Sequence, residues 1–246
     1  MASQSRVGPR DEPRQFAKTG QNRLLAALPR EMQQRLVSKM EKVPLASQQV
    51  LYAANMPITD VWFLLSGVVS LVITMKNEAT IEVATTGNEG FVGTPVVLGA
   101  DHSTTQALCQ VSGQALKMRV DVFKRALREH PELQRIVQCY IQGLISQISQ
   151  STGCNHVHTM QQRMCRWLLM THDRVGTDEF NLTQEFLAEM LGVRRPSATV
   201  TAGILQKTGL IRYQRGRIRV LDRAGLEACS CECYETVRQE FDRLLA

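Results

Sequence analysis

The stretch "LTQEFLAEMLGVRRPSATV", from Leu182 to Val200, decides the fold of the C-terminal part of the chain. Thr183 is a good N-cap for a first short helix, and Gly192 can adopt the left-handed conformation that ends it. Pro196 stands where a second helix can begin, because its missing N–H is not needed in a first helical turn. Two short helices joined by so tight a turn predict a helix-turn-helix.

The second helix would carry two adjacent arginines at its N-terminal end. This end of a recognition helix enters the major groove of DNA, and its free backbone N–H groups also attract phosphate. The residues predicted to pack inward are Ala198, Thr201, Ala202 and Leu205. The residues predicted to contact bases are Arg195, Thr199 and Val200. The residues predicted to contact the DNA backbone are Thr183, Arg194, Ser197, Arg212, Arg217 and Arg219.

A basic hairpin is predicted to follow the two helices. The segment "LIRYQRGRIRVLD", Leu210–Asp222, alternates apolar and polar residues around "QRG", which is typical of a β-hairpin. Residues 194–223 hold seven arginines and one lysine but a single acidic residue, so a polyanion such as double-stranded DNA is the expected partner. A helix-turn-helix with a basic hairpin is a winged helix. A helical hairpin with solvated arginines remains the alternative.

The first half of the chain has the pattern of an antiparallel β-roll or barrel. Between Val43 and Met118, short apolar runs such as "DVWFLL", "GVVSLVITM" and "TPVVLG" alternate with turn clusters, among them "SG". These 76 residues contain two lysines and five acidic side chains. A mildly acidic sensor domain joined to a basic module is the organisation that this asymmetry indicates.

Helical segments flank the predicted roll. Two short helices are expected within residues 22–43, and Pro131 opens a long helix. On that helix Val137, Ile141, Leu144 and Ile148 recur in alternating steps of four and three, as a two-helix seam requires. We predict a homodimer through this seam. A helix that packs only on its own domain is the alternative.

Length and composition bound the organisation of the 246 residues. No apolar run is long enough to span a bilayer, and residues 1–20 lack the apolar region of a secretory signal. Seven irregularly spaced cysteines argue against a secreted disulfide framework, so a reducing cytoplasm is expected, without membrane contact. The expected parts are a flexible arm (1–21), a sensor domain (22–130), a dimerisation helix (131–157) and a winged-helix domain (158–246).

The chain resembles the Crp/Fnr family of bacterial transcription regulators. The similarity rests on "LLAALP", "LYAANMPITDVWFLLSGVVSLV", "GNEGFVG", the long helix and "LTQEFLAEMLGVRR". It implies an α+β fold with a cyclic-nucleotide-binding-like β-roll, and a homodimer that binds palindromic promoter sites and contacts RNA polymerase. By the same resemblance Arg195 matches the family's base-contacting arginine, while Pro196 stands where an acidic base-contacting residue often occurs.

The resemblance also bears on the effector. In nucleotide-binding relatives "GNEGFVG", here Gly87–Gly93, lies beside the ribose and phosphate, and an Arg-Ser pair follows about ten residues later. This chain has "DHSTTQA" at Asp101–Ala107 instead, so cyclic AMP is not the expected effector. The pocket for an unknown small molecule is predicted from Gly90, Phe91, Val92, Gly93, Thr104 and Thr105. Gly87, Gly90 and Gly93 are expected to be turn residues, because glycine spacing alone rarely marks a phosphate site.

Cysteine and histidine are concentrated in "CNHVH" (Cys154–His158) and "CSCECY" (Cys229–Tyr234). Oxygen-sensing relatives hold an iron–sulfur cluster with N-terminal cysteines, and none precedes Cys109 here. If the second segment is helical, Cys231 points away from its two neighbouring cysteines. We therefore expect structural cysteines, with no metal site and no cofactor. A redox-reactive thiol is the alternative.

No nucleophile elbow, P-loop, paired catalytic carboxylates or metal-helix motif occurs, so an enzyme is not expected. The prediction is a sequence-specific DNA-binding transcription regulator. The alternatives are a small-ligand-binding regulatory protein and a cysteine-based redox-responsive regulator.

Overall fold

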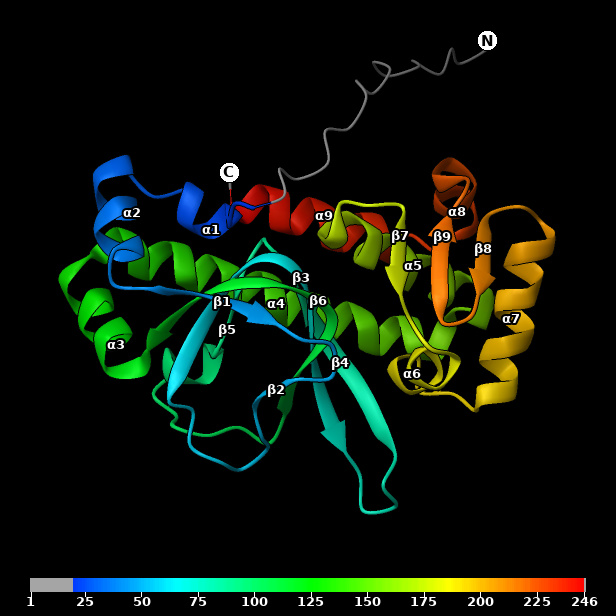
Figure 1. Ribbon diagram of the computed structural model, residues 1–246, viewed down its shortest axis with the longest axis horizontal. Helices are drawn as coiled ribbons and strands as arrows, with labels where there is room; N and C mark the ends of the chain where they lie inside the picture. The colour runs from blue at the N-terminus through cyan, green and yellow to red at the C-terminus, as the bar shows by residue number, and fades with distance from the viewer. Residues whose placement is uncertain (1–19, 246) are drawn as a thin grey trace, which may run out of the picture.

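The computed structural model describes residues 20–245 (Figure 1). Residues 1–19 of the arm expected over residues 1–21 lie outside this part of the chain. Gly20 donates its amide hydrogen to the carbonyl of Leu65 at 3.1 Å, and Asn88 donates to the carbonyl of Gln21 at 3.4 Å. The last two residues of the expected arm are therefore hydrogen-bonded to the domain that follows them.

The N-terminal half is an antiparallel β-roll, which confirms the predicted fold. Its elements are α1 (Arg23–Ala26), α2 (Arg30–Val37), β1 (Glu41–Leu45), β2 (Val50–Tyr52), β3 (Asp60–Thr74), β4 (Thr80–Thr86), β5 (Phe91–Val92), η1 (Thr94–Val96) and β6 (Gln106–Arg119). The main path of the sheet runs β1-β6-β3-β4, with β2 paired to β6 and β5 to β3. Every pairing is antiparallel.

The predicted break at "SG" is wrong, because β3 continues through it as one 15-residue strand. The pairing of β3 with β6 shifts register around Ser66, and Gly67 has a φ of 83°. Opposite it, a Cβ on Gly113 would lie 2.1 Å from the carbonyl oxygen of Ser66. The two glycines thus make a bulge, which bends the strand pair without ending it.

The prediction of a strand at "TPVVLG" is also wrong. Residues Thr94–Val96 form the 3₁₀ helix η1, which begins after Gly93 in a left-handed conformation with a φ of 113°. Pro95 lies in this first turn and has no N–H to offer a sheet ladder. A short apolar run with an internal proline favours a turn over a strand.

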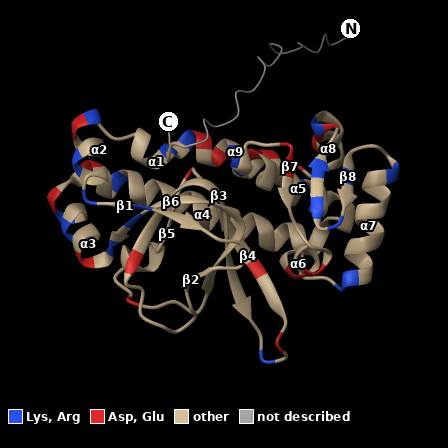
Figure 2. Ribbon diagram, viewed as in Figure 1, with Lys and Arg blue, Asp and Glu red and all other residues tan. Residues whose placement is uncertain are grey.

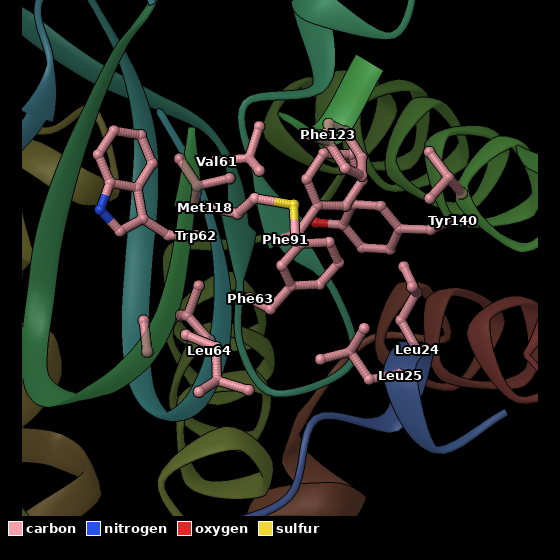
Figure 3. Close-up of a cluster of buried hydrophobic side chains, with 14 of the residues drawn as sticks. Leu24, Leu25, Val61, Trp62, Phe63, Leu64, Phe91, Met118, Phe123 and Tyr140 are labelled. Atoms are coloured by element: carbon pink, nitrogen blue, oxygen red, sulfur yellow. The ribbon is translucent and has the colours of Figure 1, made fainter. Parts of the chain in front are cut away.

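An aromatic cluster fills the space between the roll and the helices that cover it (Figure 3). The ring of Phe91 lies 5.4 Å from Phe63, 5.6 Å from Phe123 and 5.4 Å from Tyr140, measured between centroids. Phe123 comes from α3 (Val120–Glu129) and Tyr140 from α4 (Pro131–Val157). The long helix is therefore fixed to the roll by apolar contacts on one side.

The predicted dimer seam lies on this buried side of α4, so that assignment is corrected. Val137 is fully buried, Ile141 and Leu144 are 6% and 5% exposed, and all three belong to the core of the roll. Ile148 is partly buried and packs against the same core. Apolar residues at alternating spacings of four and three occur on a helix that packs against its own sheet and also on one that packs against a partner helix. The sequence pattern could not separate these two cases.

The C-terminal half consists of helices around a small three-stranded sheet. Its elements are α5 (Met160–Val175), β7 (Glu179–Asn181), α6 (Gln184–Met190), α7 (Arg195–Lys207), β8 (Ile211–Gln214), β9 (Arg217–Val220), α8 (Arg223–Cys229) and α9 (Cys233–Leu244). The sheet order is β7-β9-β8. The last helix, α9, returns to pack along α4, where a Cβ on Gly143 would lie 2.7 Å from the ring of Phe241.

A buried ion pair joins the two halves. Arg174, near the end of α5, donates from Nε to the Glu89 carboxylate of the β4–β5 loop at 2.9 Å, and both side chains are under 10% exposed. Arg174 also donates to Gln147 of α4 at 3.2 Å. Burial alone would raise the pKa of Glu89, but the charge and hydrogen bonds of Arg174 outweigh it and lower that pKa. The pair is therefore ionised at neutral pH.

A second polar contact lies beside this pair. Trp167 of α5 donates its indole N–H to Glu82 of β4 at 2.9 Å, and Ser70 donates its hydroxyl to the same carboxylate at 2.6 Å. Burial raises the pKa of Glu82 to about 7, although both donors and the nearby charges of Arg166 and Arg174 act to lower it. The contact between α5 and β4 therefore includes a carboxyl group that titrates near neutral pH.

Replacing Arg174 should test how strongly the ion pair holds the halves together. Arg174→Met leaves the buried Glu89 carboxylate unpaired and should lower the free energy of unfolding by about 3–5 kcal/mol. Urea denaturation at neutral pH measures this. The double variant Glu89→Gln, Arg174→Met should recover much of the lost stability. The control is Arg35→Met, which breaks the exposed ion pair with Glu31 and should change the free energy of unfolding by less than about 1 kcal/mol.

The effect of Arg174→Met should also depend on pH. Because the folded pKa of Glu89 lies below its ordinary value of 4.5, the pair stabilises the protein above that pH. Its contribution is lost as the pH falls through the lowered pKa. The difference between wild type and Arg174→Met should therefore shrink in acid, and a constant difference from neutral pH to strongly acidic pH would contradict the assignment.

Candidate nucleic-acid interface

The helix-turn-helix forms at the predicted residues. Thr183 is the N-cap of α6, where its hydroxyl oxygen accepts from the amide of Phe186 at 3.2 Å. Gly192 has a φ of 62° and lies in the turn after α6. The second helix, α7, begins at Arg195 with Arg194 as its N-cap, so that Pro196 lies within its first turn.

The two faces of α7 divide as the sequence predicts. The inward side chains Ala198, Thr201, Ala202 and Leu205 are all buried. On the other side Arg195 and Thr199 are exposed, and the side chain of Val200 is 64% exposed. Arg195, Thr199 and Val200 are therefore all accessible from solvent.

Side chains of α6 hold two of the predicted base-contacting residues. Arg195 forms an ion pair with Glu185 at 2.6 Å, with both side chains more than half exposed. Thr199 donates its hydroxyl to Gln184 at 2.9 Å. An exposed ion pair contributes about 0–1 kcal/mol, so Arg195 can leave Glu185 at little cost when a stronger partner arrives.

The predicted hairpin is present as β8 and β9. Its turn residues Arg215 and Gly216 both have positive φ, 51° and 74°, as a two-residue turn of type I′ requires. Ile211, Ile218 and Val220 point into the core of this domain, while Arg212, Arg217 and Arg219 are exposed. Arg217 pairs with Glu179 at 3.6 Å, and this pair is also solvent-exposed.

Two hydrogen bonds connect the hairpin to the start of the helix-turn-helix. Tyr213 donates its hydroxyl to the carbonyl of Leu182 at 2.9 Å, and the amide of Leu182 donates to Gly216 at 2.7 Å. Thr183 therefore lies beside the tip of the hairpin. In Figure 2 basic segments appear on β9 and near both ends of α7, at the end of the molecule away from α2 and α3.

The residues of the predicted effector pocket differ in their surroundings. Phe91 and Val92 are 1% exposed and pair with β3, so they are core residues. Thr104 is exposed and Thr105 bonds to Ser103 at 2.9 Å. Among residues 20–245, no hydrogen bond or ion pair joins these threonines to the loop Gly90–Gly93.

The glycines of this loop allow close approach of the chain's own side chains. A Cβ on Gly87 would lie 2.4 Å from Arg174, and one on Gly90 would lie 1.9 Å from the ring of Tyr140. The hydroxyl of Tyr140 shares a hydrogen bond with Thr86 at 2.9 Å. The loop expected beside a nucleotide is therefore packed against α4 and α5. Sequence reasoning missed Arg174, because no local pattern marks its partner 85 residues away.

No helix within the described residues 20–245 is long and apolar enough to cross a membrane. No curated protein matches the chain in a search by similarity.

Solved structures share the fold. A transcriptional regulator of the crp/fnr family from Eubacterium rectale superposes with a TM-score of 0.65 at 16% identity, covering 84% of this chain and 96% of that one. The c-di-GMP responsive global regulator CLP from Xanthomonas campestris gives 0.64 at 12% identity, covering 78% and 99%. The CRP/FNR family regulator TTHA1359 from Thermus thermophilus gives 0.61 at 21% identity, covering 77% and 98%.

Two family models match successive parts of the chain. The model described as a cyclic nucleotide-binding domain matches residues 42–130, which contain the strands of the roll apart from Glu41 of β1. The model described as a Crp-like helix-turn-helix domain matches residues 162–229, which contain α6, α7 and the hairpin. With both domains in this order, the chain belongs to the Crp/Fnr type of transcription regulators.

Proposed function

We propose that the protein binds palindromic promoter sites as a homodimer, with α7 in the major groove and the β8–β9 hairpin beside it. The exposed arginine pair at the start of α7 is the observation that carries this proposal. A helix N-terminus offers free N–H groups and a positive dipole end, and both attract phosphate. Selection of bound sequences from a random duplex pool is the experiment that tests sequence-specific binding.

Within this interface we assign different tasks to the arginines. The guanidinium fork of Arg195 can bind guanine O6 and N7 together, while Thr199 and Val200 approach neighbouring base edges. The residues assigned to the DNA backbone are Thr183, Arg194, Ser197, Arg212, Arg217 and Arg219. Glu185 competes with DNA for Arg195, and its exposed ion pair must open when the duplex binds.

The dimer surface that we propose is the solvent-exposed side of α4. There Gln138, Gln142, Ile145 and Ser149 are exposed and recur in steps of four and three, the spacing of a two-helix seam. Ile145 is 50% exposed and supplies the apolar contact. This side is turned away from both the roll and α9, so a partner helix can lie on it without displacing either.

The effector is not cyclic AMP in this proposal. The carboxylate of Glu89 already accepts from Arg174, and Tyr140 lies against Gly90, so the loop is held by its own chain. Ser103 and Thr104 supply no cation for a phosphate, and a buried phosphate needs one. Another small molecule remains the proposed effector class.

The remaining parts of the proposal follow from promoter binding. RNA polymerase is the expected protein partner, and the cytoplasm of a bacterium is where its promoters are found. The chain regulates transcription without an enzymatic step of its own.

Arginine substitutions should separate base contacts from backbone contacts. Arg195→Ala should relax the preference at one base pair per half-site, with a loss of about 1–3 kcal/mol of discrimination. Arg217→Ala should weaken all duplexes alike and lower the salt slope by about one. Binding-site selection at fixed salt measures both, with Arg35→Ala, an exposed arginine of α2, as the matched control. If Arg195→Ala keeps the wild-type preference and Arg217→Ala loses it, the proposed docking is wrong.

A charge on the exposed side of α4 should break the dimer. Ile145→Asp places two carboxylates at the proposed seam, so sedimentation should show monomers with a native circular dichroism spectrum. Leu98→Asp is the control, because Leu98 is 69% exposed on the roll and should leave the dimer intact. A dimer of unchanged affinity in Ile145→Asp would move the interface to another surface.

Cyclic AMP should not bind. Calorimetric titration with millimolar cyclic AMP should release no heat beyond dilution, since the Gly87–Gly93 loop is held by Arg174 and Tyr140. Saturable binding at micromolar concentration would refute this.

A further inference from the structure

Four side chains of the types that bind metal ions converge at the junction between α4 and the DNA-binding half. The ligand atoms of Cys154, His158, Cys231 and Cys233 all lie within 4.8 Å of one another. The three cysteines are buried and the histidine is partly buried. Cys154 lies in the last turn of α4 and His158 is its C-cap, while Cys231 precedes α9 and Cys233 is its first residue.

The sequence expectation of separate structural cysteines did not anticipate this cluster. That expectation considered a helix through residues 229–233, but α8 ends at Cys229 and Ser230 is extended, with a φ of −78° and a ψ of 169°. The break turns Cys231 toward Cys233. Cys229 packs elsewhere and accepts from Gln161 at 3.1 Å. The other two ligands come from a segment more than 70 residues earlier in the chain.

The separations match those around a single tetrahedral ion. The sulfurs of Cys154 and Cys231 are 3.6 Å apart, and the sulfur of Cys233 is 3.5 Å from Nδ1 of His158. A zinc–sulfur bond of about 2.3 Å gives a sulfur–sulfur edge of about 3.8 Å in a tetrahedron. A set of three cysteines and one histidine is also a recurrent composition of structural zinc sites.

We propose that Cys154, His158, Cys231 and Cys233 bind one Zn²⁺ ion as a structural site. Three thiolates and an imidazole favour zinc over the oxygen-preferring ions magnesium and calcium. Zinc has no redox chemistry, and four protein ligands leave no open position, so the site acts on structure.

Groups around the four ligands support this assignment. Nε2 of His158 lies 3.2 Å from the Glu232 carboxylate, which leaves Nδ1 directed at the sulfur cluster. A carboxylate on the second imidazole nitrogen is the usual arrangement for a metal-binding histidine. Gln150 donates to the sulfur of Cys233 at 3.1 Å, which stabilises a thiolate.

Two other uses of the cluster fit less well. A disulfide between Cys154 and Cys231 would require the sulfurs to approach to about 2.05 Å, and it would leave Cys233 and His158 without a function. In an iron–sulfur cluster the ligands bind different iron atoms, so they are spread around a larger body than one ion. Ligand atoms that all lie within 4.8 Å of one another suit a single ion.

The location gives the ion a defined task. The helix α5 begins at Met160, two residues after His158, so the site lies at the hinge between the long helix and the DNA-binding half. Cys231 and Cys233 follow the helix-turn-helix and the β8–β9 hairpin, and the ion would close a loop around both. All four ligands lie outside the segments that match the two family models. The site is thus independent of the promoter-binding proposal.

Metal analysis of the full chain, purified under reducing conditions without a histidine tag, tests the proposal. Inductively coupled plasma mass spectrometry should find about one zinc per chain. Cys154→Ser, Cys231→Ser and Cys233→Ser should each lower that content. Cys165→Ser and Cys229→Ser are matched controls, since these cysteines lie nearby outside the group, and their zinc content should stay at the wild-type level.

Cobalt gives a readout of the ligands themselves. Co²⁺ in place of zinc should show tetrahedral ligand-field bands and a thiolate-to-cobalt charge-transfer band, which each of the three serine variants should weaken by about one third. If a variant fails to fold, wild type suffices: removing zinc with a chelator should lower Tm, and Zn²⁺ but not Mg²⁺ should restore it.

Three results would overturn the proposal. The first is that reduced wild-type protein holds no metal and takes up neither Zn²⁺ nor Co²⁺. The second is that the bound metal is iron. The third is that the zinc content stays unchanged in Cys231→Ser and Cys233→Ser. Arg195→Ala should keep its zinc, so failure of DNA binding and failure of the metal site are distinguishable.

Discussion

The buried ion pair between Glu89 and Arg174 is the contact on which the arrangement of the two halves depends. Glu89 belongs to the β4–β5 loop and Arg174 to α5, so the pair fixes the DNA-binding half against the roll. Two charges taken out of water stabilise a protein only when each finds its partner, and either alone would be strongly unfavourable. The pair therefore favours one relative placement of the two halves. Its carboxylate, Glu89, belongs to the loop that lies beside the nucleotide in nucleotide-binding relatives, as the resemblance implies.

The two carboxylates at this junction respond to pH in opposite directions. Glu89 stabilises the folded protein while it is ionised, so acid removes its contribution. Burial raises the pKa of Glu82 in the folded protein to about 7, so the unfolded chain loses this proton first and the fold becomes less stable as the pH rises from 4.5 to 7. The contact of α5 with the roll is thus weakened at both extremes. Of the two, only Glu82 titrates near neutral pH, where it also accepts from Trp167.

What the sequence could predict depends on how local the determining interaction is. Thr183, Gly192 and the buried face of α7 were predictable, because caps, turns and helical periodicity involve residues a few positions apart. The burial of Val137 was not, since an apolar stripe does not reveal whether its own roll or a partner covers it. The convergence of Cys154 with Cys231 could not be predicted for the same reason. It depends on the end of helix α8 before Ser230 and on the return of α9 along α4. Both errors concern contacts between elements far apart in sequence.

The helix α5 connects the proposed zinc site to the roll. Its C-terminal end is attached to the roll through Arg174, and its N-terminal end follows the proposed zinc site at His158. Between these ends Trp167 contacts Glu82. A helix fixed at two points moves as a rigid body only if one of them yields. The ligands of the proposed zinc site come from α4 and from the chain at the start of α9. The partner of Arg174, in contrast, belongs to a loop of the roll. The end of α5 near Arg174 is therefore joined directly to the β4–β5 loop of the roll.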